Sequence, residues 1–298
     1  ATWIAALRAY APDIVLFPDI GMDRVTQAVA ALRHAPVQVA AWGHPVTSGL
    51  DTIDYFLSAD ACEPEDAAGH YSERLVRLPR LGCYLDPPAT TTQPARRTEP
   101  GETFRFLCVQ NADKLHPAHD ALFARILQAS PHARLDVLCN AKTAITAAAL
   151  ADRLRTEFSR HGVDFDSRCR VHARLPVAAY QRLLDQADAC LDSLDFSGGI
   201  TSLDSLWRDL PIVTLPGALM RGRQSYGMLR LLGIDELIAV DTDDYVRIAT
   251  RLAQDAPWRD ALTKRIDAAK TRLYRDADAV HALAAFLRSV EPPVAPSA

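Results

Sequence analysis

From Asp192 to Trp207 the chain reads DSLDFSGGITSLDSLW, and the rest of the sequence is arranged around this stretch. Ala189–Leu191, just before it, is apolar like the end of a short buried strand, and Ile200–Trp207 has the apolar spacing of a helix. Gly198 and Gly199 lie in the turn between them, where the missing Cβ atoms let the backbone approach a ligand closely. Such a turn leads into a helix N-terminus, which favours an anion and typically a phosphate.

Three polar side chains follow at the start of this expected helix. Thr201 and Ser202 fall at its N-terminus, where their hydroxyls can add hydrogen bonds to a phosphate. Asp204 lies about one turn further on, where a carboxylate can accept hydrogen bonds from a ribose diol. The same residues also suit a tight turn with an ordinary N-cap. Taken alone, the motif leaves both interpretations open.

Bulk properties limit the class of protein. The chain has 298 residues, 49% of them apolar, which is enough for a sizeable core and suggests two domains. Its formal charge of −4 is not the basic footprint that nucleic acid requires, so we expect no nucleic-acid partner. No apolar run approaches the ~18 residues of a membrane helix, so we expect no membrane partner.

The cysteines point to a reducing compartment. They are scattered in apolar, strand-like contexts and form neither a CxxC pair nor a Cys/His spacing, so we expect buried, reduced thiols in a cytoplasmic protein. The six are Cys62, Cys83, Cys108, Cys139, Cys169 and Cys190.

The first part of the chain predicts a parallel sheet. Apolar runs at Asp13–Phe17 and Val37–Trp42 flank a helical pattern at Arg24–Arg33, which is the order of a βαβ unit. His44 follows the second run, where ligands bind in open α/β sheets, and Pro45 after it favours an extended backbone. His44 is therefore either presented to a ligand or a loop histidine without a task.

A proline-rich segment separates this part from the next. Residues 86–102 carry four of the nineteen prolines and almost nothing apolar, which predicts a linker. From Phe104 the alternation of strands and helices resumes, and it predicts a doubly wound domain of at least five strand-helix units. The expected strands are Phe104–Val109, Arg134–Cys139, Arg168–Val171, Ala189–Leu191 and Ile212–Leu215, with a long helix from about Lys142 to Arg160 and closing helices to Val290.

Four loops should meet at one edge of the second sheet, namely residues 110–117, 173–176, 195–201 and 216–223. Lys114 in the first of them can supply the charge that a diphosphate requires, or it is an ordinary solvated lysine. Arg221 and Arg223 are open to the same two interpretations. Asp241-Thr242-Asp243 matches a metal-binding DxD string, but it precedes a helical pattern, so capping by Thr242 or Asp243 is favoured and no metal is expected.

Four motifs together resemble a known family. Their order resembles the catalytic region of the O-linked N-acetylglucosamine transferases and their SPINDLY-type bacterial relatives, over about Asp13 to Asp255. The motifs are GHPVTSGLDTIDYFLSADACEPEDAAGHYSERLVRLP, QNADKLHP, ADACLDSLDFSGGITSLDSLWRDLPIVTLPG and RGRQSYGMLRLLGIDELIA.

The resemblance implies a GT-B fold: two Rossmann-like α/β domains, each a parallel sheet with helices on both faces, with the nucleotide sugar held mainly by the second. Residues 1–85 would be the C-terminal part of the first domain, which would be incomplete, 103–290 the second domain and 291–298 a tail. The chain would be a piece of a longer polypeptide with TPR repeats upstream.

The resemblance also implies roles for single residues. Lys114 would stabilise the departing UDP without a metal or another cofactor, and His44 would lie near the sugar and the acceptor. Leu175 would meet the base through its backbone, with Tyr180 packing nearby. The nucleotide-sugar-binding set would be Asn111, Leu175, Tyr180, Gly198, Gly199, Thr201, Ser202 and Asp204.

Departures from the family leave the donor open. The family usually has His immediately before a Thr-Thr pair, where this chain has Ile200 and then Thr201-Ser202. Tyr180 stands where a histidine is common, and His44-Pro45 is similar to the HMW1C-like N-glucosyltransferases.

From the resemblance as a whole we expect an inverting, metal-independent transferase that moves GlcNAc or another hexose from a UDP-sugar to Ser or Thr of proteins. The alternatives are transfer to Asn and a nucleotide-sugar-binding module without catalysis. A Rossmann dehydrogenase fits poorly, because no GxGxxG follows the first strand.

Overall fold

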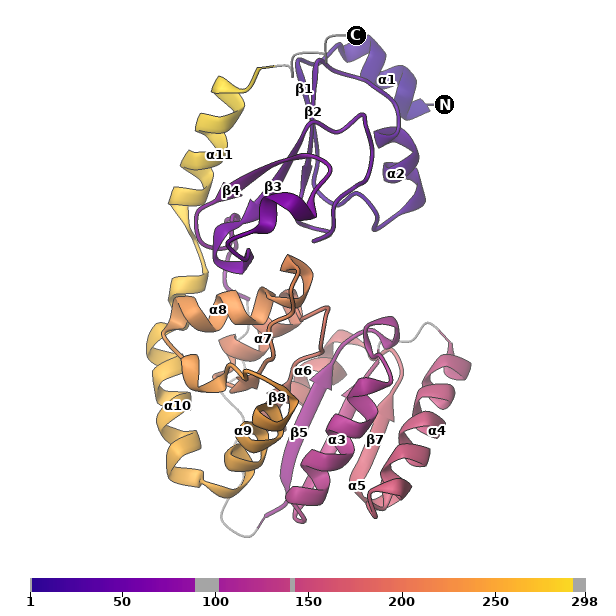
Figure 1. The fold of residues 1–298 in the computed structure, drawn as a ribbon, viewed down its shortest axis with the longest axis vertical. Helices are drawn as coiled ribbons and strands as arrows, with labels where there is room; N and C mark the ends of the chain where they lie inside the picture. Colours follow the sequence, from indigo (N-terminus) through magenta and orange to yellow (C-terminus); the bar gives the residue numbers. More distant parts are fainter. Residues whose placement is uncertain (1, 89–101, 140–142, 292–298) are drawn as a thin grey trace. The chain divides into compact units, whose positions relative to one another are not determined.

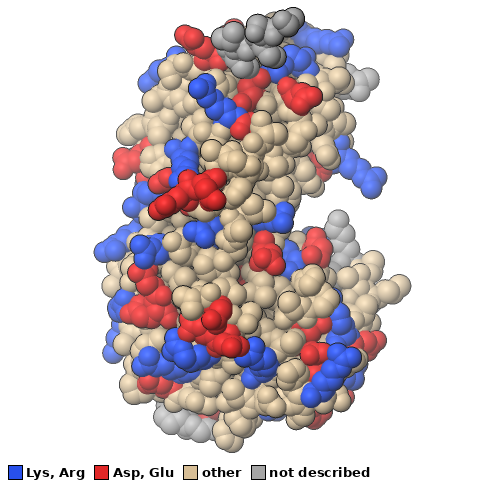
Figure 2. Space-filling model, in the orientation of Figure 1, with Lys and Arg blue, Asp and Glu red and all other residues tan. Residues whose placement is uncertain are grey.

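The computed structural model describes residues 2–88, 102–139 and 143–291, and the chain divides into two compact units (Figure 1). The first unit contains Ala1–Leu85, Leu219–Arg221 and Arg275–Ala298, and the second contains Asp86–Ala218 and Gly222–Tyr274. Lysine and arginine side chains are interspersed with acidic ones over the face shown in Figure 2, so no broad field of one sign covers that face.

The first unit is built on a parallel sheet in the order β1-β2-β3-β4. The strands are β1 Ile14–Phe17, β2 Val37–Ala41, β3 Tyr55–Ala59 and β4 Arg74–Leu78, and the preceding helices are α1 Thr2–Tyr10 and α2 Arg24–Ala30. Asp23 starts α2, because its Oδ1 accepts hydrogen bonds from the amides of Val25 (2.7 Å) and Thr26 (2.8 Å). The expected βαβ unit is therefore present, and a 3₁₀ turn, Ala67–His70, precedes β4.

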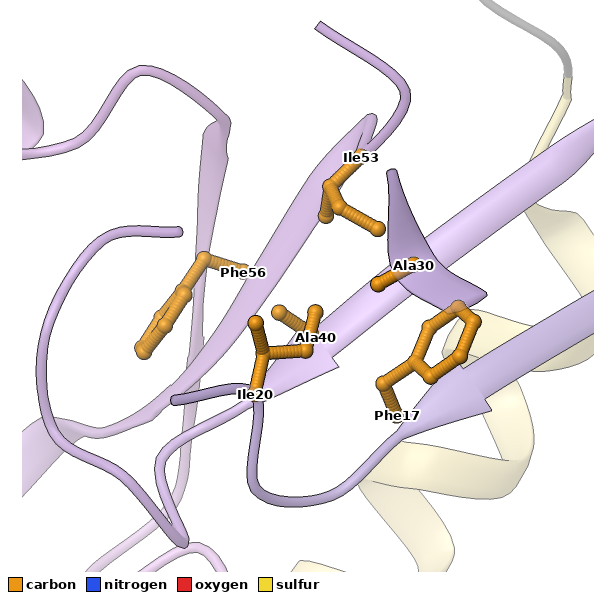
Figure 3. Packing of buried hydrophobic residues seen from close by; sticks show 6 residues of the cluster. All are labelled: Phe17, Ile20, Ala30, Ala40, Ile53 and Phe56. Carbon is orange, nitrogen blue, oxygen red and sulfur yellow. The ribbon is translucent and has the colours of Figure 1, made fainter. Parts of the chain in front are cut away.

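Both faces of this sheet carry apolar residues. Phe17, Ile20, Ala30, Ala40, Ile53 and Phe56 form a cluster of buried side chains (Figure 3). A second cluster contains Val37, Val39, Tyr55, Leu57 and Leu78. Because alternate residues of a strand point to opposite faces, strands with two apolar faces need cover on each of them.

The helix that covers the second cluster comes from the far end of the chain. It is α11, Ala277–Ser289, whose Leu283 and Phe286 pack on that cluster. The rings of Phe286 and Tyr55 lie 5.3 Å apart, and the Tyr55 hydroxyl donates to the Glu291 carbonyl at 3.1 Å. The sequence placed this helix in the second domain, up to residue 290, and the structure corrects that assignment. The apolar period of a helix shows that one of its sides is buried but does not show against which sheet.

The second unit contains a parallel sheet in the order β7-β6-β5-β8-β9. Its strands are β5 Phe104–Val109, β6 Ala133–Leu138, β7 Cys169–His172, β8 Ala189–Leu191 and β9 Ile212–Val213. The chain proceeds outward from β5 in one direction and then returns to β8 on its other side. The strand order therefore reverses between β5 and β8, which is where doubly wound sheets bind ligands.

Helices flank this sheet. The longer ones are α3 Ala118–Ala129, α4 Ala144–Arg160, α6 Val177–Asp185, α7 Ile200–Trp207, α8 Gln224–Leu232, α9 Thr242–Gln254 and α10 Ala256–Ala269, and α5 Phe165–Arg168 is a single turn. Short 3₁₀ turns lie at Asp60–Cys62, Ala112–Lys114 (η3), Met220–Gly222, Asp235–Leu237 and Lys270–Leu273. The α/β class with parallel sheets is thus confirmed. Among the described residues, no helix has both the length and the apolar character needed to cross a membrane.

Two helix starts differ from the prediction. Helix α9 is capped by Asp241, whose Oδ1 accepts from the Asp244 amide at 2.8 Å, and not by Thr242 or Asp243. Asp241 has the extended backbone of an N-cap, which aims its carboxylate at the first turn. Helix α4 begins at Ala144 with Thr143 as its cap, while Lys142 lies outside the described residues. So do residues 89–101 of the expected linker and 292–298 of the expected tail.

Candidate functional site

A cavity of about 440 Å³ lies at the carboxyl ends of the second unit's strands. We call it the carboxyl-edge cavity. Three of the four predicted loops contribute to its wall, and the fourth, residues 216–223 with Arg221 and Arg223, does not. The predicted residues in the wall are Asn111, Lys114, Leu175, Tyr180, Gly199, Thr201 and Asp204. The wall also contains Val109, Gln110, Leu138, Arg174, Val177 and Ile200, which the sequence did not single out.

Lys114, in the η3 turn after β5, points its ammonium at the glycine turn. Its Nζ lies 3.2 Å from the Ser197 carbonyl oxygen and 3.3 Å from Oε1 of Gln110. The Phe196 ring lies beneath the ammonium, 4.2 Å from Nζ to the ring centre. Burial lowers the pKa of Lys114, although the nearby charge of Asp192 acts in the opposite direction. The closest partners are thus neutral, so the ammonium has its positive charge available for an anion.

A buried carboxylate shapes the glycine turn. Asp192, at the end of β8, is 2% exposed, and its Oδ1 accepts from the amides of Ser193 (3.0 Å) and Gly198 (2.8 Å). Its Oδ2 accepts from the Thr214 hydroxyl at 2.8 Å. Burial raises the pKa of Asp192, and these hydrogen bonds oppose the rise. Because the Gly198 amide is bound to Asp192 and Gly198 is absent from the wall, the structure does not place Gly198 as a direct ligand contact.

Side chains pack closely around both glycines of the turn. A Cβ on Gly199 would lie 2.7 Å from Oε1 of Gln224, and one on Gly198 would lie 2.7 Å from Nε2 of Gln110. Gly199 lines the cavity and immediately precedes α7. The first amides of a helix have no intrahelical acceptor, so those at the start of α7 can donate to an anion. Gly199 therefore lies where the backbone could approach a ligand, and that approach stays a prediction, while Gly198 leaves room for the side chains around the turn.

The two hydroxyl residues of α7 face different surroundings. Thr201 lines the cavity. Ser202 is 4% exposed, and its Oγ lies 2.8 Å from that of Ser225 in α8. Ser202 therefore does not line the carboxyl-edge cavity, and its expected contact with a phosphate stays a prediction. One residue along a helix turns the side chain by about 100°, and here that turn is from the cavity to the packing with α8.

Asp204 and Tyr180 form a pair in the cavity wall. The Tyr180 hydroxyl donates to Oδ2 of Asp204 at 2.8 Å, and both side chains are half-buried. Burial raises the pKa of the Asp204 carboxyl, while the bond from Tyr180 lowers it. Among the residues that the structure describes, Oδ1 of Asp204 has no donor. One carboxylate oxygen is thus fixed and the other can accept from a ligand.

The remaining candidates lie as follows. Asn111 and Leu175 are in the wall, each next to a strand end. His44 is in the first unit, in the loop after β2, and its ring lies so close to Gly21 that a Cβ there would be 2.7 Å from Cδ2 of His44. His44 is not among the residues that line the carboxyl-edge cavity. Over residues 2–88, 102–139 and 143–291, no group of three or more His, Cys, Asp or Glu side chains is arranged to hold a metal.

Three of the wall residues that the sequence missed lie at the ends of strands. Val109 and Leu138 end their strands, and Gln110 directly follows β5. Their position at the carboxyl edge was predictable from the strand ends. Their apolar or amide character, however, is also typical of core and loop residues, so nothing distinguished them beforehand.

Comparison with known proteins gives these residues a context. The model of glycosyl transferase family 41 matches residues 22–84 and 100–276. The probable UDP-N-acetylglucosamine–peptide N-acetylglucosaminyltransferase SPINDLY of Solanum lycopersicum is 31% identical over 227 residues, which cover 76% of this chain and 24% of that protein. The UDP-glucose:protein N-beta-glucosyltransferase of Actinobacillus pleuropneumoniae is 28% identical over 258 residues, covering 85% of this chain and 40% of that protein.

Solved structures extend the comparison from sequence to fold. The Thermobaculum terrenum O-GlcNAc transferase, as its K341M mutant, superposes with a TM-score of 0.80 and 28% identity, over 96% of this chain and 54% of that one. The pneumococcal O-GlcNAc transferase GtfA, at 12% identity and a TM-score of 0.59, shares the fold alone. The chain spans about a quarter of the length of the SPINDLY relatives. Because the family model covers most of its residues, this chain belongs to glycosyl transferase family 41.

Proposed function

We propose that this chain carries the donor-binding part of an inverting, metal-independent protein glycosyltransferase, which moves GlcNAc or another hexose from a UDP-sugar to Ser or Thr of proteins. Family membership and the names of the relatives support the reaction class. The observation that carries the proposal is the Lys114 ammonium, 3.2 Å from the Ser197 carbonyl oxygen of the glycine turn, in a cavity that Asp204 also lines.

The chemistry follows from charge. When the bond between the sugar and the phosphate breaks, negative charge develops on the departing diphosphate. Lys114 and the amides at the start of α7 would stabilise that charge more than the charge of the intact donor, which is what speeds the reaction. Because their environment is partly dry, these donors act more strongly than they would in water. An ammonium and a helix N-terminus thus take the place that a divalent metal has in other sites.

The rest of the wall would hold the nucleoside. Asp204, with its free Oδ1, would accept hydrogen bonds from the ribose hydroxyls, and Tyr180 would lie beside the base. Leu175 would contact the base through its backbone. His44 remains a predicted contact of the sugar and the acceptor.

Sugar transfer tests the proposal. The chain is incubated with peptides and with labelled UDP-GlcNAc, UDP-glucose or GDP-fucose, and we expect transfer from a UDP-sugar. Lys114→Ala should slow transfer by about a hundredfold to a thousandfold, the usual cost of removing one charge-stabilising donor. Lys264→Ala, on the exposed surface of α10, is the matched control and should not slow it. If Lys114→Ala transfers as fast as the unchanged chain, the role of Lys114 is wrong. If UDP binds without transfer, the chain is a binding module.

One relative favours a second acceptor. The Actinobacillus pleuropneumoniae protein named as an N-glucosyltransferase covers 85% of this chain, so we also propose transfer of a hexose to Asn as the alternative. Mass spectrometry of the modified peptide separates an Asn product from a Ser or Thr product.

We place this activity in the cytoplasm. Five of the six cysteines are buried and all six are free thiols, which is typical of a reducing compartment.

A further inference from the structure

The second unit contains another cavity, of about 510 Å³, whose wall has arginine residues at the amino ends of the strands and extends along β7 to His172. Arg105 and Arg134 line it and are each the second residue of their strand, β5 and β6. Val109, in the wall of the carboxyl-edge cavity, lies four residues further along β5, which is ~13 Å at the usual rise of a strand. A ligand at one end therefore does not occupy the other. We call this space the arginine cavity.

Its wall contains a row of guanidinium groups on neighbouring strands. Arg105 and Arg134 are direct partners in the register of β5 and β6. Arg168, the last residue of α5, immediately precedes Cys169 of β7, the register partner of Leu135, so it stands at the same level just before the third strand. Arg170, two residues later, lies in the wall as the register partner of the acidic Asp136. Like charges that face one another across strands destabilise a sheet, so the row costs stability until an anion compensates it.

The acidic side chains of the wall are already engaged. Asp136 pairs with Nε2 of His172 at 2.6 Å, and Asp166 pairs with Arg155 at 3.1 Å. Within the described part of the chain, neither Arg134 nor Arg170 has a carboxylate partner, and both are exposed. The Arg105 guanidinium makes a single hydrogen bond of 3.3 Å, to the neutral Gln186, while the backbone amide of Arg105 donates to Oδ2 of Asp188 at 2.8 Å. Three guanidinium groups thus keep donors for a ligand, while Arg168 uses its own on backbone carbonyls.

We infer that the arginine cavity binds a small oligophosphate anion. The planar guanidinium fork matches two oxygens of one phosphate, and several forks together select a ligand with several phosphates. Arg105, Arg134 and Arg170 lie on three adjacent strands. Neighbouring strands are ~4.8 Å apart, so these groups extend over ~10 Å, which exceeds one phosphate and suits two or more that are linked. Among the described residues, no Phe, Tyr or Trp lines the cavity, and the ring of His172 in its wall is bound to Asp136, so charge and not the stacking of a base would select the ligand.

Calorimetric titration with inorganic pyrophosphate tests this site. The chain is first saturated with UDP, so that the carboxyl-edge cavity is filled, and then titrated at low ionic strength. We expect pyrophosphate to bind once per chain. Arg134→Gln should weaken binding at least about tenfold, the loss expected for hydrogen bonds to a charged group. Arg182→Gln is the matched control, because Arg182 is exposed on α6 but does not line the cavity.

Arg170→Gln gives an independent second variant and should weaken binding in the same way. The inference is overturned if the UDP-saturated chain binds no pyrophosphate, or if Arg134→Gln and Arg170→Gln bind it as tightly as the unchanged chain. Equal weakening by Arg182→Gln would also overturn it, since the attraction would then be a property of overall charge. Binding of a phosphoserine peptide without binding of pyrophosphate would assign the cavity to a macromolecular partner instead.

Discussion

Lys114 sets the electrostatics of the carboxyl-edge cavity. It is held between a carbonyl, an amide and an aromatic ring, none of which neutralises it. Such a setting keeps the ammonium in place before a ligand arrives, so little reorganisation is needed when charge develops. The same partly dry setting lowers the pKa of Lys114, so its charge is lost at a lower pH than in water.

The first prediction concerns that pH dependence. Burial lowers the pKa of Lys114 below its ordinary 10.5, so the ammonium loses its proton at a lower pH than a solvated lysine does. UDP needs the charged form, so its affinity should fall as pH rises through the lowered pKa. Calorimetry between about pH 7 and pH 10 measures the fall. Lys114→Met has no proton to lose there, so a fall of the same size in this variant would assign the titration to another group.

The second prediction concerns the pair of Tyr180 and Asp204. Tyr180→Phe keeps the ring but removes the hydroxyl that holds Oδ2 of Asp204 at 2.8 Å. UDP affinity should drop about tenfold, because the carboxylate is no longer fixed toward the ribose. Affinity for 2′,3′-dideoxy-UDP should stay unchanged, since that ligand offers no diol. Equal losses for both ligands would show that Tyr180 acts on the base instead.

At the scale of single elements, the glycine turn depends on its support. Asp192 and Thr214 fix the end of β8, and Gly198 and Gly199 leave room for Gln110 and Gln224. The backbone at the start of α7 is thus shaped by side chains from several other elements.

The third prediction tests this support. Gly198→Ala places a Cβ against Oγ of Ser202 and 2.7 Å from Nε2 of Gln110, so these side chains or the turn must shift. We expect a lower melting temperature and weaker UDP binding together, measured by thermal unfolding with and without UDP. Gly69→Ala is the matched control, because a Cβ there meets nothing within 4 Å. Unchanged UDP binding in Gly198→Ala would show that the shape of the turn does not affect the UDP site.

The elements themselves were largely predictable. The apolar runs at Phe104–Val109 and Val37–Trp42 became buried strands, because such runs favour the interior of a parallel sheet. The approach of Lys114 to the glycine turn followed from loops that share one sheet edge. The contact of Ser202 with Ser225 and the cap at Asp241 did not follow, because they depend on partners in space and on one residue of register. Family resemblance gave the cavity a ligand, which periodicity alone does not.

At the scale of the whole molecule, the chain crosses between its two units. Helix α11 follows the last residues of the second unit but completes the core of the first. Cys83 and Asp276 also lie close together in the first unit, although they are far apart in the sequence. Burial raises the pKa of the Cys83 thiol, and the negative charge of Asp276 raises it further. The expected TPR repeats upstream stay a prediction.

The fourth prediction concerns α11. Phe286→Ala removes the ring that packs 5.3 Å from Tyr55, so we expect a loss of about 2 kcal/mol from the stability of the first unit, less than for a fully buried ring. Hydrogen exchange resolves the units: amides of β2 and β3 should exchange faster, while those of β5 and β6 should not. Val280→Ala, at a side chain that is 46% exposed, is the control. Equal acceleration in both sheets would contradict the assignment of α11.

The most direct test is a crystal structure of the chain with UDP. The account predicts the diphosphate in the carboxyl-edge cavity, within hydrogen-bonding distance of the Lys114 ammonium and the amides at the start of α7, with the ribose at Asp204. A diphosphate bound elsewhere, with Lys114 still on the Ser197 carbonyl and the cavity empty, would contradict it.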